Sequence, residues 1–301
     1  MTEPYGDIWS RWLLEQRHGG DPDQLKAVLD YLLPVRDKVL DRAGLGEDGT
    51  LLDVGCGDGL IGFGALQRVP SSQVIFSDIS AELLGQVETL AEKMRVTERM
   101  QVLQAPADDL SAVPAESVDV VSTRSVLIYV KDKAKALDEF FRVLKPGGRL
   151  SIFEPINRFT YPEPAELFCG YDVGSVADLA QKVKQVFERY QPTGSDPMLD
   201  FDERDLIWLV AESGFEEIHL EYRMDIEPMM KASGCASGNW QVFLNSADNP
   251  KIPTMGEAFA QALSPKEQEK FEAHLRPLVE GNLGINKSAV AYLWARKAGP
   301  D

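Results

Sequence analysis

The feature that most constrains the fold is a short apolar stretch that runs directly into alternating glycines. Residues 51–59 read LLDVGCGDG, and the apolar run ends at Val54. Glycine adopts backbone torsions that other residues avoid, and it lets main-chain atoms approach a ligand closely. A helix that begins after such a loop presents free N–H groups to the ligand. The segment therefore predicts a strand, a loop for a nucleotide-like ligand and a helix, as in α/β folds.

Two glycine registers compete in this loop. Counted from Gly57, residues 57–62 read GDGLIG and match the GxGxxG pattern of dinucleotide-binding loops, which leaves an NAD-dependent oxidoreductase as an alternative. Counted from Gly55, the loop reads GxGxG. In a nucleotide-binding loop the first glycine directly follows the strand, and only Gly55 does so. The sequence therefore favours the Gly55 register.

A second strand is expected to end on a carboxylate. Residues 73–80 read QVIFSDIS, in which β-branched and aromatic residues lead to Asp78, with Ile79 next to it. A carboxylate at this point can accept both hydroxyl hydrogens of the ribose of a nucleotide-like ligand. Asp78 could instead cap the following helix. We interpret it as the ribose ligand.

The alternation of strands and helices continues along the chain. Strands are expected over 100–104 and 117–123, and a helix over 134–144. The residues Lys145 to Gly148 are expected to end this helix before a strand over 149–153. The pattern is typical of a mostly parallel sheet with helices on its faces.

The glycine loop, Asp78 and the order helix–LKPGG–strand together resemble the class I S-adenosylmethionine-dependent methyltransferases over residues 50–155. The resemblance implies a Rossmann-like, seven-stranded, mostly parallel sheet flanked by helices. N-terminal lid helices and helical insertions, after strand 5 and between the last two strands, would be added to it. It also implies an enzyme that uses S-adenosyl-L-methionine as its cofactor and transfers the methyl group by in-line displacement to a small-molecule acceptor.

The resemblance also implies which residues bind the cofactor. They are Asp53, Gly55, Cys56, Gly57, Gly59, Asp78, Ile79, Ala107, Asp108, Thr123 and Arg124. The chain departs from the family at Pro106, where the family often has an aspartate that binds the adenine amine. We expect Asp108 to supply that contact.

Methyl transfer mostly requires positioning, and a general base is needed only if the acceptor starts protonated. The catalytic candidates are His18 on the predicted lid, Glu154 at the carboxyl edge of the sheet, and Arg124. Glu154 could orient or deprotonate an acceptor. It could equally form a structural ion pair with Arg124 or Arg158.

The expected organisation places a core between additions. Its segments are an N-terminal helical lid over 1–48, the S-adenosylmethionine-binding core over 49–158, an insertion or cap over 159–200, a core continuation over 201–226, a second insertion or cap over 227–286, and the final strand and tail over 287–301. Helices are expected over 8–20, 22–43, 176–190, 203–213, 255–263 and 265–281, and the last two strands over 216–224 and 288–295.

Composition bears on partners and location. The formal net charge of −17 would repel a phosphate backbone, so we expect a small-molecule acceptor and no nucleic acid. The N-terminus lacks the features of a secretory signal and no apolar run reaches a membrane-spanning length, so a cytoplasmic protein without a membrane partner is expected. The three cysteines include no CxxC pair, and no metal site is predicted. The sequence leaves the oligomeric state open.

Cys169 and Cys235 lie in the two expected insertions. Arsenite- or thiol-type methyltransferases use cysteines in comparable places, so this class is an alternative. The same two residues also fit ordinary buried thiols.

Overall fold

A computed structural model describes residues 7–17, 22–231 and 238–299. The chain divides into two compact units, each assembled from separate stretches. We call the first the sheet unit; it comprises Leu33–Ile156, Phe201–Arg223 and Ala289–Asp301. We call the second the helical unit; it comprises Met1–Leu32, Asn157–Asp200 and Met224–Ser288.

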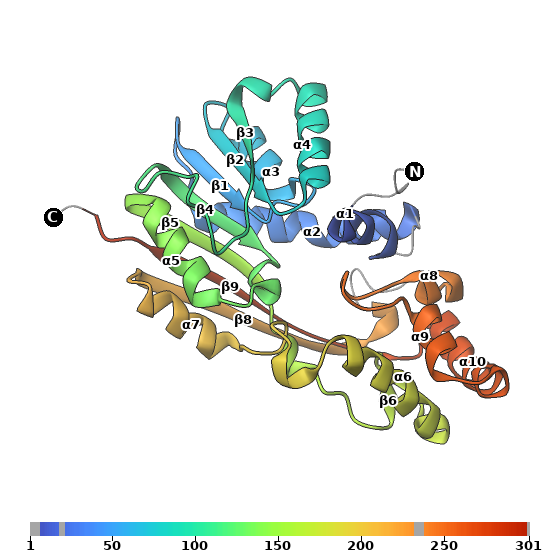
Figure 1. Cartoon of the computed structure of the whole chain (residues 1–301). Coiled ribbons are helices and arrows are strands. Elements are labelled where there is room, and N and C mark those ends of the chain that lie inside the picture. Colours follow the sequence, from blue (N-terminus) through green and yellow to red (C-terminus); the bar gives the residue numbers. More distant parts are fainter. Residues whose placement is uncertain (1–6, 18–21, 232–237, 300–301) are drawn as a thin grey trace. The chain divides into compact units, whose positions relative to one another are not determined.

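The sheet has seven strands in the order β3-β2-β1-β4-β5-β9-β8 (Figure 1). Their bounds are β1 Thr50–Val54, β2 Gln73–Asp78, β3 Met100–Gln104, β4 Val118–Arg124, β5 Leu144–Pro155, β8 Glu216–Pro228 and β9 Ile285–Arg296. β1 pairs in parallel with β2 and β4, as β2 does with β3 and β4 with β5, whereas β9 runs antiparallel to β5. The expected Rossmann-like fold, with its mostly parallel seven-stranded sheet, is confirmed.

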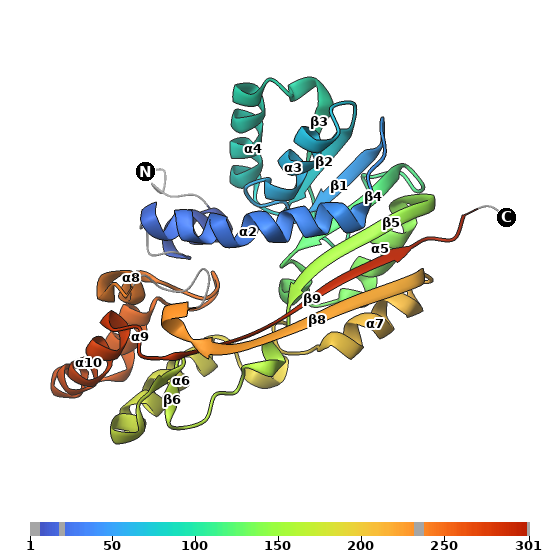
Figure 2. The ribbon, with the colours of Figure 1, turned by 180° about the vertical axis from the view of Figure 1, so that it is seen from behind.

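Helices cover both faces of this sheet. Their bounds are α2 Pro22–Ala43, α3 Leu60–Arg68, α4 Ala81–Met94, α5 Lys133–Val143 and α7 Glu203–Glu212. The second half of α2 shares one buried apolar cluster with α3, α4 and the central strands. On the other face α5 lies beside α7, where Phe141 meets Phe215 edge to face at 5.1 Å. Figures 1 and 2 show these two faces from opposite sides.

The predicted helices and strands of the sheet unit are present, with one revision. The residues LKPGG were expected to separate a helix from a strand, but β5 begins already at Leu144. Leu144 pairs with Val118, and the register then shifts so that Arg149 pairs with Val120. Gly147, at φ +80°, allows the chain to bulge here without leaving the sheet. Helix and strand propensities do not reveal such a bulge.

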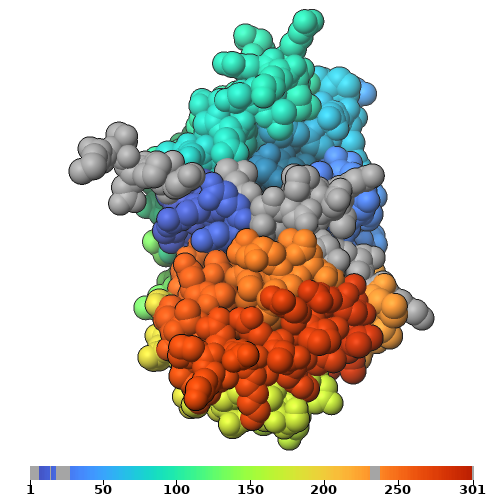
Figure 3. Space-filling view, turned by 90° about the vertical axis from the view of Figure 1, so that its right-hand side faces the viewer, coloured from blue at the N-terminus to red at the C-terminus, as the bar shows by residue number. Residues whose placement is uncertain are grey.

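The helical unit packs around its own aromatic cluster. Its elements are α1 Ile8–Arg11, a π-helical turn Trp12–Gln16, the hairpin β6 Leu167–Phe168 with β7 Tyr171–Asp172, α6 Ala177–Tyr190, α8 Trp240–Asn245, α9 Met255–Ala262 and α10 Pro265–Glu280. Phe168, Phe259 and Phe271 meet at centroid distances of 5.2 to 6.2 Å. Figure 3 shows the surface that α8, α9 and α10 form, in orange to red. The hairpin and α8 were not predicted.

The N-terminal segment is anchored within the helical unit. The Trp12 indole N–H donates to the Ala247 carbonyl at 2.8 Å, and its ring is 6% exposed. The predicted helix over 8–20 is α1 continued by the π-helical turn, and residues 18–20 lie outside the described residues. Whether this segment acts as a lid stays a prediction. Among the helices that the structure describes, none is both long and apolar enough to cross a membrane.

Close packing of α3 on β2 gives a test of the fold. A Cβ atom at Gly62 would lie 2.2 Å from Cε1 of the buried Phe76 ring. Gly62→Ala is therefore expected to lower the free energy of unfolding by roughly 1–3 kcal/mol, as measured by urea titration. Gly85 in α4 has no atom within 4 Å of such a Cβ, so Gly85→Ala should stabilise the protein, by up to about 1 kcal/mol. Equal effects of the two changes would contradict this packing.

Candidate functional site

The glycine loop connects β1 to α3 at the carboxyl end of the sheet. Gly55, Gly57 and Gly59 have φ values of +63°, +55° and +81°. β1 ends at Val54, so Gly55 directly follows the strand, as the favoured register requires. Gly59 stands at the N-cap of α3, which begins at Leu60. The loop thus exposes main chain at the place where open α/β sheets bind ligands.

Asp78 ties this loop to the end of β2. Its two carboxylate oxygens accept N–H groups from Gly57 and from Ser80, each at 2.9 Å. Ser80, not Asp78, is the N-cap of α4, because its hydroxyl oxygen accepts the Leu83 N–H at 3.1 Å. Ile79 is 45% exposed and offers an apolar surface beside the carboxylate.

Asp53 lies beneath the loop and is only 2% exposed. Its Oδ2 accepts the Gly62 N–H at 2.9 Å, which fixes the first turn of α3 to β1. Burial raises the pKa of this carboxyl to about 7, and the nearby Asp58 and Asp78 act in the same direction while Arg124 opposes them. Asp53 therefore supports the loop from behind.

Glu154 at the end of β5 is fully buried. Its Oε1 accepts the N–H groups of Val126 at 2.9 Å and Leu127 at 3.0 Å, and Oε2 accepts that of Ile128 at 3.3 Å. The Thr123 hydroxyl donates to Oε1 at 3.4 Å. These partners take the place of the ion pair with Arg124 or Arg158 that was the alternative interpretation. A direct role of Glu154 on an acceptor stays a prediction, and backbone N–H groups rather than solvent surround its oxygens.

Burial raises the pKa of Glu154 to about 7, and the four hydrogen bonds that it accepts oppose this shift. A carboxylate that is desolvated and accepts several donors is both costly to bury and strongly bound to those donors.

Arg124 and Thr123 are at the end of β4, beside β1 in the sheet. Thr123 is buried and Arg124 is half-buried.

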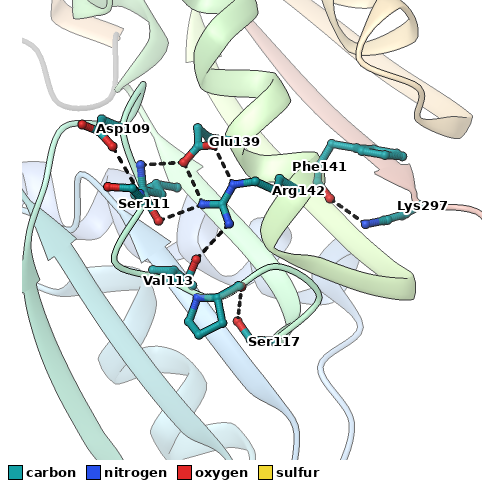
Figure 4. Close-up of polar contacts among 10 residues, drawn as sticks. Asp109, Ser111, Val113, Ser117, Glu139, Phe141, Arg142 and Lys297 are labelled. Carbon is teal, nitrogen blue, oxygen red and sulfur yellow. Dashed lines mark hydrogen bonds and ion pairs between the residues drawn. The ribbon is translucent and has the colours of Figure 1, made fainter.

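The loop after β3 carries Ala107, which is buried, and Asp108, which is half-buried. α5 holds this loop through a network that Figure 4 shows. The Glu139 carboxylate accepts the Leu110 N–H at 2.7 Å and pairs with Arg142. The Arg142 guanidinium in turn donates to the carbonyls of Leu110 and Val113 at 2.8 and 3.0 Å.

Sequence reasoning missed this pair, although Glu139 and Arg142 have the i, i+3 spacing of neighbours on a helix. It also missed Val126, whose Cγ2 would lie 2.4 Å from a Cβ at Gly55. Residue type alone gave no signal for this second contact.

The other candidates are a histidine and the cysteines. His18 and Cys235 lie outside the described residues. Burial raises the pKa of the thiols of Cys56 and Cys169 well above their usual value, and a protonated thiol is a poor nucleophile and metal ligand. In the described part of the chain no three His, Cys, Asp or Glu residues are placed to hold a metal ion.

Comparison with known proteins agrees with this geometry. Residues 52–152 match the family model described as "Methyltransferase domain". This segment contains the glycine loop, Asp78 and most of β5.

Three similar proteins differ in what their names describe. A trans-aconitate 2-methyltransferase of Azoarcus sp. is 33% identical over 145 residues, covering 48% of this chain and 53% of that protein. A tRNA 5-carboxymethoxyuridine methyltransferase of Escherichia coli is 32% identical over 102 residues, covering 34% and 38%. The crystal structure of a geranyl diphosphate C-methyltransferase from Streptomyces coelicolor is 16% identical, with a TM-score of 0.53 over 96% of this chain and 95% of that one.

The chain spans 37% to 53% of the length of the first three curated relatives that it matches. The solved structure shares the fold over nearly the whole chain.

The buried Asp53 gives a test by pH. Its pKa is raised from 3.8 to about 7, so the folded state keeps a proton that the unfolded state releases between about pH 4 and 7. The free energy of unfolding must therefore fall as pH rises through this window, by up to roughly 4 kcal/mol at about 1.4 kcal/mol per pH unit. Asp53→Asn, which keeps an oxygen for the Gly62 N–H, should make the decline measured by urea unfolding from pH 5 to 8 shallower and leave the part that Glu154 contributes.

Asp109 supplies the control, because hydrogen bonds from Ser111 lower the pKa of this exposed carboxyl. Asp109→Asn should therefore leave the decline between pH 5 and 8 in place. A wild-type profile that rises over this range would show that Asp53 is not held neutral by burial.

Proposed function

We propose that this chain, which belongs to the class I S-adenosylmethionine-dependent methyltransferases, is an enzyme that transfers the methyl group of S-adenosylmethionine to a small-molecule acceptor. The observation that carries the proposal is the 2.9 Å hydrogen bond from the Gly57 N–H to Asp78. This bond joins the loop that directly follows β1 to the carboxylate that ends β2. The loop and the carboxylate that we assign to the ribose are therefore direct neighbours.

The described residues fit an adenosyl ligand. A Cβ at Gly55 would meet Val126 at 2.4 Å and one at Gly59 would meet Phe63 at 2.6 Å, so close packing of these side chains requires glycine at both positions. We assign Gly55 to Gly59, including Cys56, to the amino-acid side of the cofactor, and Asp78 to its ribose hydroxyls. The exposed Ile79 is assigned to the adenine ring.

Further groups complete the proposed cofactor site. Ala107 and Asp108 belong to the adenine side, and Thr123 and Arg124 come from the end of β4. Asp53 acts from beneath the loop through the Gly62 N–H.

When bound, the cofactor supplies an electrophilic methyl group on a sulfonium centre. The residues of the chain then contribute orientation, because in-line displacement requires the two reacting atoms to be held about 3–3.5 Å apart. Loop and strand-end hydrogen bonds that are already formed reduce the ordering that binding would otherwise require. A general base is needed only for an acceptor that arrives protonated.

Charge supports the choice of a small acceptor. The chain carries 48 acidic and 31 basic side chains, a formal net charge of −17, which opposes the approach of a polyphosphate backbone. The names of the relatives do not decide the matter, because they include a small carboxylic acid and a tRNA base. An oxidoreductase is less well supported, because that register would place Gly57 directly after the strand, whereas β1 ends at Val54, three residues before Gly57.

Calorimetric titration tests the cofactor. S-adenosylmethionine and S-adenosylhomocysteine should bind, and NAD(H) should not. Asp78→Asn should weaken both affinities at least about tenfold, because losing a charge-assisted hydrogen bond costs roughly 1.5–3 kcal/mol. Asp109→Asn changes a carboxylate whose partner is Ser111 and should leave binding unchanged. Binding of NAD(H) alone would establish the Gly57 register and refute the proposal.

A methyl-incorporation assay tests the acceptor class. Purified protein is supplied with labelled S-adenosylmethionine and, in separate reactions, small carboxylic acids, amines, phenols, thiols, arsenite or bulk tRNA. We expect label in one of the small-molecule reactions and none in tRNA. Incorporation into tRNA would contradict the small-acceptor proposal while leaving the cofactor assignment intact.

A further inference from the structure

The segment after β4 makes an abrupt turn at the carboxyl edge of the sheet. Ser125 has φ +57°, and its N–H donates to the Phe153 carbonyl on β5 at 2.8 Å. The chain then forms a 3-10 turn over Leu127–Tyr129. The first N–H groups of such a turn have no partner within it and must be satisfied from outside.

A single side chain satisfies them. Glu154 is the last residue but one of β5. Its carboxylate accepts three successive N–H groups, those of Val126, Leu127 and Ile128, at 2.9 to 3.3 Å. The carboxylate is fully buried, and Leu127 and Ile128 are 0% and 3% exposed. A neutral amide could not replace it, because an amide has one acceptor oxygen and an NH₂ group that would face donors.

The same segment contacts the glycine loop. A Cβ atom at Gly55 would lie 2.4 Å from Cγ2 and 3.1 Å from Cγ1 of Val126. Val126 thus packs directly on the bare backbone of Gly55, at the point where β1 gives way to the loop. The three N–H bonds that fix Val126–Ile128 therefore also fix the side chain against which Gly55 rests.

We propose that Glu154 is a positioning residue that holds Val126–Ile128 against Gly55 and thereby sets the glycine loop in the conformation that binds the cofactor. This inference rests on the proposed function for its effect on cofactor affinity. The contacts that link Glu154 through Val126 to Gly55 do not depend on the proposed function. The role differs from that of an acceptor-binding or proton-abstracting group, because Glu154 acts through Val126 and touches neither reactant.

Glu154→Gln and a matched control test the connection. Glu163 in the helical unit accepts the N–H groups of Cys169 and Gly170 at 2.9 and 2.7 Å, so Glu163→Gln makes the same chemical change at another turn. Hydrogen–deuterium exchange without cofactor should show faster exchange over 125–130 and over 55–60 in Glu154→Gln. Glu163→Gln should leave both segments unchanged.

Binding and turnover give the second readout. Glu154→Gln should raise the dissociation constant for S-adenosylmethionine at least about tenfold and raise KM for it, with a smaller change in kcat at saturating cofactor. Glu154→Asp, which keeps the charge, should recover part of the loss. Val126→Ala removes the contact with Gly55 without touching the carboxylate, and it keeps the test open if Glu154→Gln does not fold.

A double-mutant cycle then decides whether the two residues act in series. If Glu154 works through Val126, the losses of affinity in Val126→Ala and Glu154→Gln should not add. Additive losses, or faster exchange at 125–130 with an unchanged glycine loop, would overturn the proposal. If the wild-type protein bound no S-adenosylmethionine, the proposed function would fail, and the exchange of 55–60 in the same variants would still decide the connection to Gly55.

Discussion

Backbone N–H groups donated to carboxylates hold the carboxyl edge of this sheet together. Loops that leave parallel strands have no ladder partner, yet a buried N–H must find an acceptor. Asp53, Asp78 and Glu154 provide one at the ends of β1, β2 and β5, and Glu139 provides another from α5. Each of these carboxylates accepts an N–H group from outside its own strand or helix. The conformation of these loops is therefore set by hydrogen bonds to the strand ends and to α5. The glycines allow the positive φ angles that this conformation requires.

This arrangement explains which parts of the site the sequence revealed. The strands, the loop and the acidic end of β2 could be predicted because glycine spacing indicates unusual local backbone torsions and apolar runs indicate buried strands. The role of Glu154 could not, because a carboxylate after a strand has the same sequence whether it faces a ligand or the next loop. The bulge in β5 and the helix α8 were not predicted for a related reason, because strand register and short helices depend on contacts with distant segments.

The stabilisation of these loops has an electrostatic cost. Burial raises the pKa of both Asp53 and Glu154 to about 7, so keeping either ionised above neutral pH works against folding. A chain selected for stability alone would replace such groups with apolar ones. Their presence at the strand ends indicates that a defined loop geometry is worth more here than the stability that is given up, as is common where residues are organised for function.

The position of β9 has a consequence for how the protein is made. β9 lies between β5 and β8, although it follows both of them in the sequence. During synthesis β5 and β8 are complete well before their shared neighbour leaves the ribosome, so each has an open hydrogen-bonding edge in the meantime. β9 closes both edges at once, and a chain cut before it would lose an interior strand and leave β8 with no neighbour on that side. β9 thus completes the sheet only after both of its neighbours have been made.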